Sequence, residues 1–78
     1  MPTYNGHKNW NHWNVALWIA NDEGLYRLAL QFLRECGGRT GAAAELLLSE
    51  LRAGGKEKTP DGAPYTRTSL RAALRGLS

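Results

Sequence analysis

Few residues in this sequence have the chemistry of a nucleophile, an acid–base pair or a metal ligand. The one cysteine, Cys36, closes an apolar stripe, which favours a buried structural thiol over a reactive one. If that helix end is exposed, Cys36 would instead form an intermolecular disulfide. His7 and His12 are five residues apart and lack the i, i+4 spacing that puts two zinc ligands on one helical face. Asp22 and Glu23 are adjacent, so their carboxylates point in different directions on a helix. We expect no catalytic site, no metal site and no cofactor.

Three tryptophans, Trp10, Trp13 and Trp18, fall within nine residues and alternate with asparagines and a histidine. Trp13 and Trp18 lie on different faces of a helix, so burying both requires cover on two sides of that helix. One interpretation is that all three pack the N-terminal segment over the helices that follow. The other is that part of the cluster is exposed, where tryptophan suits a protein-binding hot spot or stacking on unpaired bases. Trp10 is our candidate for such a contact.

A basic stripe is expected near the C-terminus. Arg67, Arg71 and Arg75 recur every four residues, which places them on one solvent-facing side of a helix, and Lys56 and Lys58 precede them in a polar loop. Surface helices often carry arginine for solubility alone. The functional interpretation is an electrostatic surface for a polyanion or for an acidic face of another protein. These five side chains complete the set of candidate partner-binding residues.

Length and composition indicate a small globular protein. The chain has 78 residues, of which 42% are hydrophobic and 22% charged, enough for one domain with one core. Its longest apolar run, Val15–Ala20, is far shorter than the roughly 18 residues of a membrane span. A single cysteine excludes a disulfide scaffold, and the first residues lack the apolar region of a signal peptide. We expect a cytoplasmic protein with no membrane partner.

Charge is distributed unevenly along the chain. Residues 1–51 hold four basic and five acidic residues, whereas residues 52–78 hold six basic and two acidic residues. The net charge of +3 therefore comes from the C-terminal third. This balance favours polyanionic partners, either nucleic acid or an acidic protein surface, and it argues against an acidic mimic of DNA.

Helical periodicity dominates between three glycine-containing breaks, and it predicts a small all-α bundle of about four short helices. The expected parts of the single domain (1–78) are a polar and aromatic segment (1–12), a helical core (13–53), a loop (54–65) and a basic helix (66–77). A short hairpin around Lys56–Tyr65 is the one departure from helix that we expect. The predicted helix-capping residues are Asn11 or His12, Asn21 or Asp22, Thr40, and Thr66 or Thr68.

The apolar residues predict which side of each helix packs. In the first helix Trp13, Ala16, Leu17 and Ala20 share one face. The second helix has the clearest stripe, ended by Gly37 and formed by Leu25, Leu28, Ala29, Phe32, Leu33 and Cys36. The inward residues predicted for the last two helices are Ala44, Leu47, Leu48, Leu51, Leu70, Ala73, Leu74 and Leu77.

Several short motifs resemble a known family. Trp13–Ile19 (Trp-Asn-Val-Ala-Leu-Trp-Ile) and Asn21–Tyr26 (Asn-Asp-Glu-Gly-Leu-Tyr) resemble a family of short, uncharacterised proteins encoded by bacteriophages and prophages. Tyr4-Asn5-Gly6 and Asn9-Trp10 belong to the same resemblance, and Thr59-Pro60-Asp61-Gly62 is similar to a second marker of that family. The resemblance covers the first third of the chain closely and the last third loosely. The family supplies no agreed activity and no site.

The phage context implies a mode of action. Small phage proteins without a catalytic constellation commonly bind a host macromolecule, and anti-CRISPR proteins are a well-populated class of such inhibitors. The resemblance therefore implies a non-enzymatic inhibitor of host defence that binds a CRISPR–Cas effector in the host cell cytoplasm and blocks target DNA binding. A small nucleic-acid-binding phage regulator and a structural or assembly accessory protein stay open as alternatives. A homodimer stays open as well.

Overall fold

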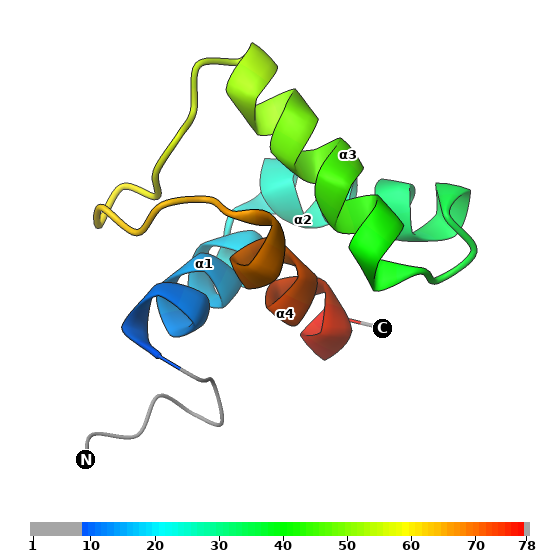
Figure 1. Ribbon diagram of the computed structural model, residues 1–78, viewed down its shortest axis with the longest axis horizontal. Coiled ribbons are helices and arrows are strands. Elements are labelled where there is room, and N and C mark those ends of the chain that lie inside the picture. Colours follow the sequence, from blue (N-terminus) through cyan, green and yellow to red (C-terminus); the bar gives the residue numbers. More distant parts are fainter. Residues whose placement is uncertain (1–8, 78) are drawn as a thin grey trace.

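The fold consists of four helices joined by short turns and one long loop. The structure is a computed structural model that describes residues 9–77 (Figure 1). Within this range it contains α1 (Trp10–Asn21), α2 (Glu23–Glu35), α3 (Thr40–Ala53) and α4 (Arg67–Leu77), and no strand. The predicted all-α class and the number of helices are confirmed. No helix among these four has the length and apolar character needed to cross a membrane.

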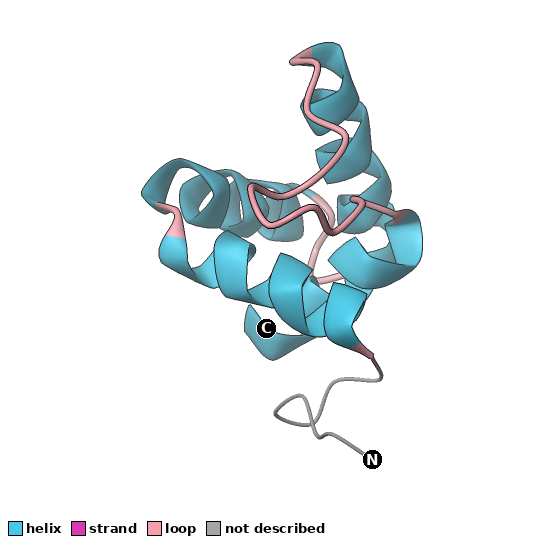
Figure 2. Ribbon diagram, turned by 90° about the vertical axis from the view of Figure 1, so that its left-hand side faces the viewer, coloured by secondary structure: helices cyan, strands magenta, loops and turns pink. Residues whose placement is uncertain are grey.

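The C-terminal helix joins the other elements. α4 packs against both α1 and α3, and α2 packs against α3 and α1. Figure 1 shows α3 across the top of the molecule, with α1 and α4 side by side below it. The loop between α3 and α4 runs over one side of the bundle, which faces the viewer in Figure 2. The loop therefore lies over the region where α1 meets the other helices.

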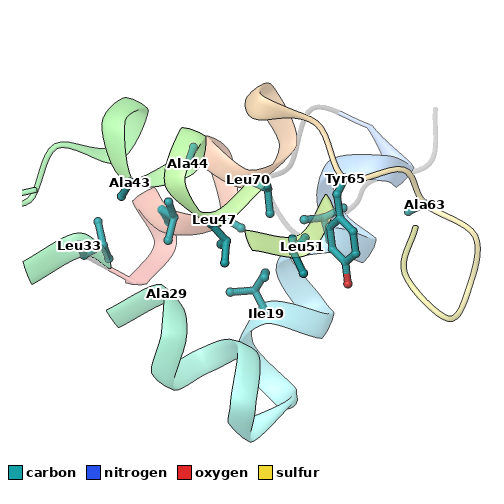
Figure 3. Close-up of a cluster of buried hydrophobic side chains, with 13 residues drawn as sticks. Ile19, Ala29, Leu33, Ala43, Ala44, Leu47, Leu51, Ala63, Tyr65 and Leu70 are labelled. Atoms are coloured by element: carbon teal, nitrogen blue, oxygen red, sulfur yellow. The ribbon is translucent and has the colours of Figure 1, made fainter. Parts of the chain in front are cut away.

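The core is small and consists mainly of leucine and alanine. In Figure 3 Leu47 and Leu51 of α3 point toward Ile19 of α1. Ala43 and Ala44 are fully buried, and their small side chains let α3 approach its neighbours closely. The buried hydrophobic residues are Val15, Ile19, Ala29, Leu33, Ala43, Ala44, Leu47, Leu51, Ala63, Tyr65, Leu70, Ala73 and Leu74. The predicted inward side chains of α3 and α4 belong to this cluster, with Leu48 and Leu77 packed on its edge.

α1 begins earlier than predicted. Its N-cap is Asn9, whose side-chain Oδ1 accepts a hydrogen bond from the His12 backbone N–H at 3.0 Å. The prediction of a cap at Asn11 or His12 is therefore wrong. Asparagine is among the best N-cap residues, and with the cap at residue 9 the helix includes Trp10. The polar segment predicted for residues 1–12 is thus helical from residue 10 on, and residues 1–8 lie outside the described part.

The side of α1 that faces the core is also different from the apolar face singled out in the sequence. The core-facing residues are Val15 and Ile19, with Asn14 beside them. Leu17 and Ala20, from the predicted face, are exposed. Apolar residues occupy both sides of this helix, so periodicity alone could not distinguish the core-facing side from the outer side.

α2 and its ends follow the prediction. Asp22 is the N-cap, and its side chain accepts a hydrogen bond from the Leu25 backbone N–H at 3.0 Å. The helix buries Ala29 and Leu33, and the other members of the predicted stripe pack against the core. Gly37 follows with φ of 63°, a left-handed conformation that suits glycine after a helix end.

α3 begins one residue earlier than predicted. Thr40 is the first helical residue, and the N-cap position belongs to Arg39, whose side chain makes no capping hydrogen bond. The prediction of Thr40 as the cap is therefore wrong by one residue. The shift of the cap does not change which side of α3 packs, and the buried leucines and alanines lie on the predicted inner face.

The loop after α3 contains a tight turn rather than a full hairpin. The Gly62 N–H donates to the Thr59 carbonyl at 2.9 Å, which closes the turn, and Lys58 forms one isolated antiparallel bridge with Pro64. The expected hairpin is thus reduced to this single bridge in the described range. Thr66 then caps α4, as predicted: its Oγ1 accepts from the Ser69 N–H, and the Ser69 Oγ accepts from the Thr66 N–H, both at 3.0 Å.

Candidate functional site

The three predicted arginines lie on the solvent side of α4. Arg67, Arg71 and Arg75 are all exposed, whereas Leu70 and Leu74 of the same helix are buried in the core. We call these three residues the arginine face. Together they give α4 a surface that attracts negatively charged partners.

Arg67, in the arginine face, has a structural partner on α3. The Arg67 Nε donates to the Glu45 Oε1 of α3 at 3.1 Å. Exposed pairs of this kind contribute about 0–1 kcal/mol. The same guanidinium lies over Gly41, where a Cβ would come within 2.9 Å of its Nη2. Arg67 therefore links α4 to α3, while Arg71 and Arg75 extend farther along the helix.

The two predicted lysines lie on the loop and not on α4. Lys56 and Lys58 border a depression of about 240 Å³ that also includes Trp18, Asp22 and Tyr65. Tyr65 is almost completely buried, and this burial raises the pKa of its hydroxyl group, with a smaller contribution from the negative charge of Asp22. Because a carboxylate lies among the lysines, this depression is less positive than the arginine face.

The tryptophan cluster divides into three different environments. Trp10 lies in the first turn of α1 and is 38% exposed. Trp13 is half-buried and lines a surface depression between α1 and α4. Trp18 is half-buried on the other side of α1, where its Nε1 donates to the Asp61 Oδ2 at 2.9 Å. Of the three, Trp10 is the exposed one, and Trp18 binds the loop through Asp61.

A polar network that sequence analysis missed joins α1 to the loop. Asn14 is only 2% exposed, and its Nδ2 donates to the Asp61 Oδ2 at 2.9 Å. The Thr59 Oγ1 donates to the Asn14 Oδ1 at 2.6 Å, and it accepts from the Ala63 N–H at 3.0 Å. Among the described residues no buried side-chain nitrogen or oxygen lacks a partner. The network therefore compensates for burying Asn14 and Thr59.

The charge of Asp61 is stabilised by the same network. The hydrogen bond from Asn14 lowers the pKa of the Asp61 carboxyl group below its ordinary value, and the bond from Trp18 adds to this effect. Hydrogen bonds to a carboxylate favour its ionised form. A signal was present in the sequence: Asn14 lies between apolar residues in the Trp13–Ile19 motif, and Asp61 lies in the Thr59-Pro60-Asp61-Gly62 marker.

A depression between α1 and α4 forms the apolar part of the surface. It has a volume of about 260 Å³, and its lining residues are Trp13, Ala16, Leu17, Ala20, Ala73, Gly76 and Leu77. We call it the α1–α4 depression. Its α1 side is the apolar face singled out in the sequence, which packs here at the surface instead of in the core. The arginine face and this depression share one helix, α4.

The residues that the sequence offered as candidates for catalysis cap a helix, pack against the core or form an ion pair. Cys36 is half-buried, caps the C-terminal end of α2 and packs against the core. Asp22 caps α2, and Glu23 forms an ion pair with Arg27 one turn later. His7 lies outside the described residues. In the range 9–77, no three His, Cys, Asp or Glu side chains gather in a way that could hold a metal ion.

One comparison with known proteins gave a match. A family model described as a family of unknown function (DUF7249) matches residues 1–74. No curated protein and no solved structure matches the chain.

Proposed function

The chain belongs to DUF7249, a family of unknown function, and we propose that it is a non-enzymatic binding protein that inhibits a host defence system. In its narrowest form, the proposal is a phage-encoded anti-CRISPR protein that binds a CRISPR–Cas effector in the host cytoplasm and blocks target DNA binding. The resemblance of the two sequence motifs to phage proteins supports the biological context. The arginine face of α4 is the observation that carries the proposed mode of action.

The arginine face suits an acidic protein surface. Arg71 and Arg75 are exposed one helical turn apart, so both can meet carboxylates on the same partner. Complementary charge increases the rate of association and fixes the orientation of the two proteins. Effector surfaces that bind DNA are themselves basic, so an acidic patch elsewhere on the effector is the expected contact. Blocking would then result from steric overlap with DNA or from a locked effector conformation.

Apolar contacts favour a protein partner over nucleic acid. Trp10 and Leu17 are 38% and 37% exposed, and Leu17 lines the α1–α4 depression. Aromatic residues and arginines dominate the binding energy of protein interfaces, where they fill apolar pockets. A phosphate backbone contains nothing that fills a pocket lined by leucine and alanine. The combination of both surfaces on one helix supports a protein target.

The experiment is an inhibition assay with purified CRISPR effectors of several types and labelled target DNA. The wild-type chain should prevent DNA binding by at least one effector. The double charge reversal Arg71→Glu/Arg75→Glu should weaken this inhibition about tenfold or more, because attraction becomes repulsion. The matched control is Arg39→Glu/Arg52→Glu, the same charge change at two exposed residues, one at the N-cap of α3 and one in its last turn.

Both negative outcomes are informative. If the reversal of Arg71 and Arg75 leaves inhibition at the wild-type level, the arginine face has no role in it. If no effector is inhibited, the anti-CRISPR proposal is wrong. Thermal unfolding of each variant establishes that a loss of inhibition does not come from loss of fold.

A nucleic-acid-binding regulator is the second candidate, favoured by the net charge of +3 and the arginine face. It predicts direct binding to DNA or RNA whose affinity falls steeply with salt, with a slope of about −0.9 per phosphate contacted on B-DNA. A complex with the effector that forms equally well after nuclease treatment would exclude this candidate as the cause of inhibition.

A further inference from the structure

α1 is apolar on both sides, which is unusual for a helix at a protein surface. Its 12 residues include no Asp, Glu, Lys or Arg. Val15 and Ile19 are in the core, while Trp13 and Leu17 are on the opposite side. A helix that is hydrophobic all round is normally buried on all sides. Within the described part of the chain, Leu17 and Ala20 on the outer side of α1 are exposed, and both line the α1–α4 depression.

A second depression continues the α1–α4 depression past the end of α4. It has a volume of about 490 Å³, and its lining residues are Leu30, Leu33, Arg34, Gly37, Gly38 and Leu77. Leu77 lines both depressions, so it is where they meet. We call the two together the Leu77 surface. It extends from the outer side of α1, over the last turn of α4, to the C-terminal end of α2.

The charge of the Leu77 surface has one sign. Arg34 is the one charged residue among those that line the two depressions, and Arg75 neighbours the lining residue Gly76 in sequence. Glu35 follows Arg34 at the end of α2 and does not line either depression, and its Oε1 accepts from the Gln31 Nε2 at 3.5 Å. Other carboxylates with a described neighbour lie farther away: Glu23 at Arg27, Glu45 at Arg67, Asp61 at Asn14 and Trp18, and Asp22 and Glu50 beside Lys56. An apolar surface with a cationic rim fits an occupant that is apolar with carboxylates at its edge.

We propose that the Leu77 surface binds an acidic amphipathic helix of a partner protein. Such a helix carries apolar side chains at i, i+3, i+4 and i+7, which would fill the two depressions, and carboxylates beside them would meet the Arg34 guanidinium. The proposal deepens the proposed function, on which it rests, by stating what the partner presents. It also separates the role of α1 from that of the arginine face.

Charge argues against a second copy of this chain as the occupant. A two-fold axis at Leu77, where the two depressions meet, would bring the Arg34 end of one copy against the α1 side of the other, and α1 has no Asp or Glu to pair with it. Covering Arg34 without an opposite charge opposes association. An acidic helix has no such conflict, because a carboxylate beside its apolar side chains can pair with Arg34.

The test is a selection from a random displayed library of 16-residue peptides against the full chain. Enriched peptides should carry apolar residues at helical spacing together with an excess of Asp and Glu. Their affinity should fall about tenfold or more for Leu17→Glu and for Arg34→Glu, since each change places negative charge against the bound peptide.

Two matched controls are available in the chain. Leu46 of α3 is another exposed leucine, 43% exposed, and Arg52 occupies the last turn of α3 as Arg34 occupies that of α2. Leu46→Glu and Arg52→Glu should bind the enriched peptides like the wild type. Amide chemical shifts of the labelled chain should change on peptide addition along α1, at Leu77 and near Gly37.

Three results would overturn the proposal. These are a library that yields no enriched peptide, enriched peptides without an acidic excess, and peptides that bind Leu17→Glu as tightly as the wild type. Sedimentation equilibrium provides a further check: a dimer that Leu17→Glu dissociates would identify a second copy as the occupant instead. Loss of effector inhibition plays no part in this test, so the two proposals can fail separately.

Discussion

Asp61 shows how much one exposed residue can organise in a small protein. Its Oδ2 accepts hydrogen bonds from Asn14 and from Trp18, both on α1, and the Thr59 hydroxyl group completes the network from the same turn. Charge-assisted hydrogen bonds are stronger than neutral ones. The turn at 59–62 is therefore bound to α1 by hydrogen bonds between side chains of the Trp13–Ile19 motif and of the Thr59–Gly62 marker.

This network predicts a pH dependence of stability. The pKa of Asp61 is lower in the folded chain than its ordinary value, because the carboxylate accepts both bonds. Its contribution is therefore complete above the ordinary aspartate pKa of about 3.9 and is lost as the pH falls through the lowered folded value. Urea denaturation of the wild type between neutral and strongly acidic pH should show this loss, and Asp61→Asn should reduce it.

One result of these denaturation experiments would contradict the role of Asp61. If the free energies of unfolding of the wild type and of Asp61→Asn fall in parallel with acidity, Asp61 does not contribute to the acid sensitivity of the fold. Asp61→Asn should in addition be less stable than the wild type at neutral pH, where the charged acceptor is fully formed in the wild type.

At the scale of the helices, the ends vary in how they are stabilised. Asn9, Asp22 and Thr66 each accept a hydrogen bond from a backbone N–H in the first turn of a helix. α3 lacks such a side-chain cap, although Thr40 is at its start. The stability of the four helices should therefore depend on different single residues.

A pair of threonine variants tests this difference. Thr66→Ala removes the cap of α4 together with its reciprocal bond to Ser69, and we expect a loss of about 0.5–2 kcal/mol in the free energy of unfolding. Thr40→Ala removes no capping bond and should change stability by less than about 0.5 kcal/mol. Chemical denaturation followed by circular dichroism measures both, and equal losses would contradict the assignment of the caps.

The sequence predicted the helices better than it predicted their ends and faces. α2 has a polar outer side and a single apolar stripe, so its cap, its stripe and its end at Gly37 were all recognisable. In α1 the apolar side chains are on both sides, and only tertiary packing decides that Val15 and Ile19 go inward. The caps of α1 and α3 were predicted at the wrong residues because Asn11, His12 and Thr40 lie close to the true caps, Asn9 and Arg39.

At the scale of the whole molecule, the chain depends on one core that all four helices share. α4 lies between α1 and α3, and its Leu70 and Leu74 are fully buried. A chain of this length has a total stability of about 4–12 kcal/mol, from roughly 0.05–0.15 kcal/mol per residue. Removal of one large side chain from α4 therefore affects the entire fold.

The corresponding prediction compares two leucines. Leu70→Ala leaves a cavity in the core and should cost about 2–5 kcal/mol, enough to unfold a large share of the molecules at moderate temperature. Leu46→Ala, at a leucine that is 43% exposed, should stay within about 0.5 kcal/mol of the wild type. Thermal melts with the intrinsic tryptophan signal would reveal either result, and a similar melting temperature for both variants would contradict the shared core.

The candidate surface was only partly accessible to prediction. The spacing of Arg67, Arg71 and Arg75 was sufficient to place them on one exposed side of α4. Lys56 and Lys58 lie on a separate part of the molecule, beside Tyr65. Their position depends on the path of the loop, which helical periodicity does not describe. The meeting of two depressions at Leu77 depends on how three helices pack, and a pattern within one helix cannot contain that information.

The bonds between α1 and the turn at 59–62 also have a consequence for the lifetime of the native state. They link residues that are 43 to 47 positions apart in the chain, so they require both α1 and the turn to be in place before they form. Contacts that form after the folding transition state slow unfolding and hardly affect the folding rate. We therefore expect the network around Asp61 to slow the separation of the loop from α1, so that Asp61→Asn raises the unfolding rate more than it lowers the folding rate in stopped-flow measurements.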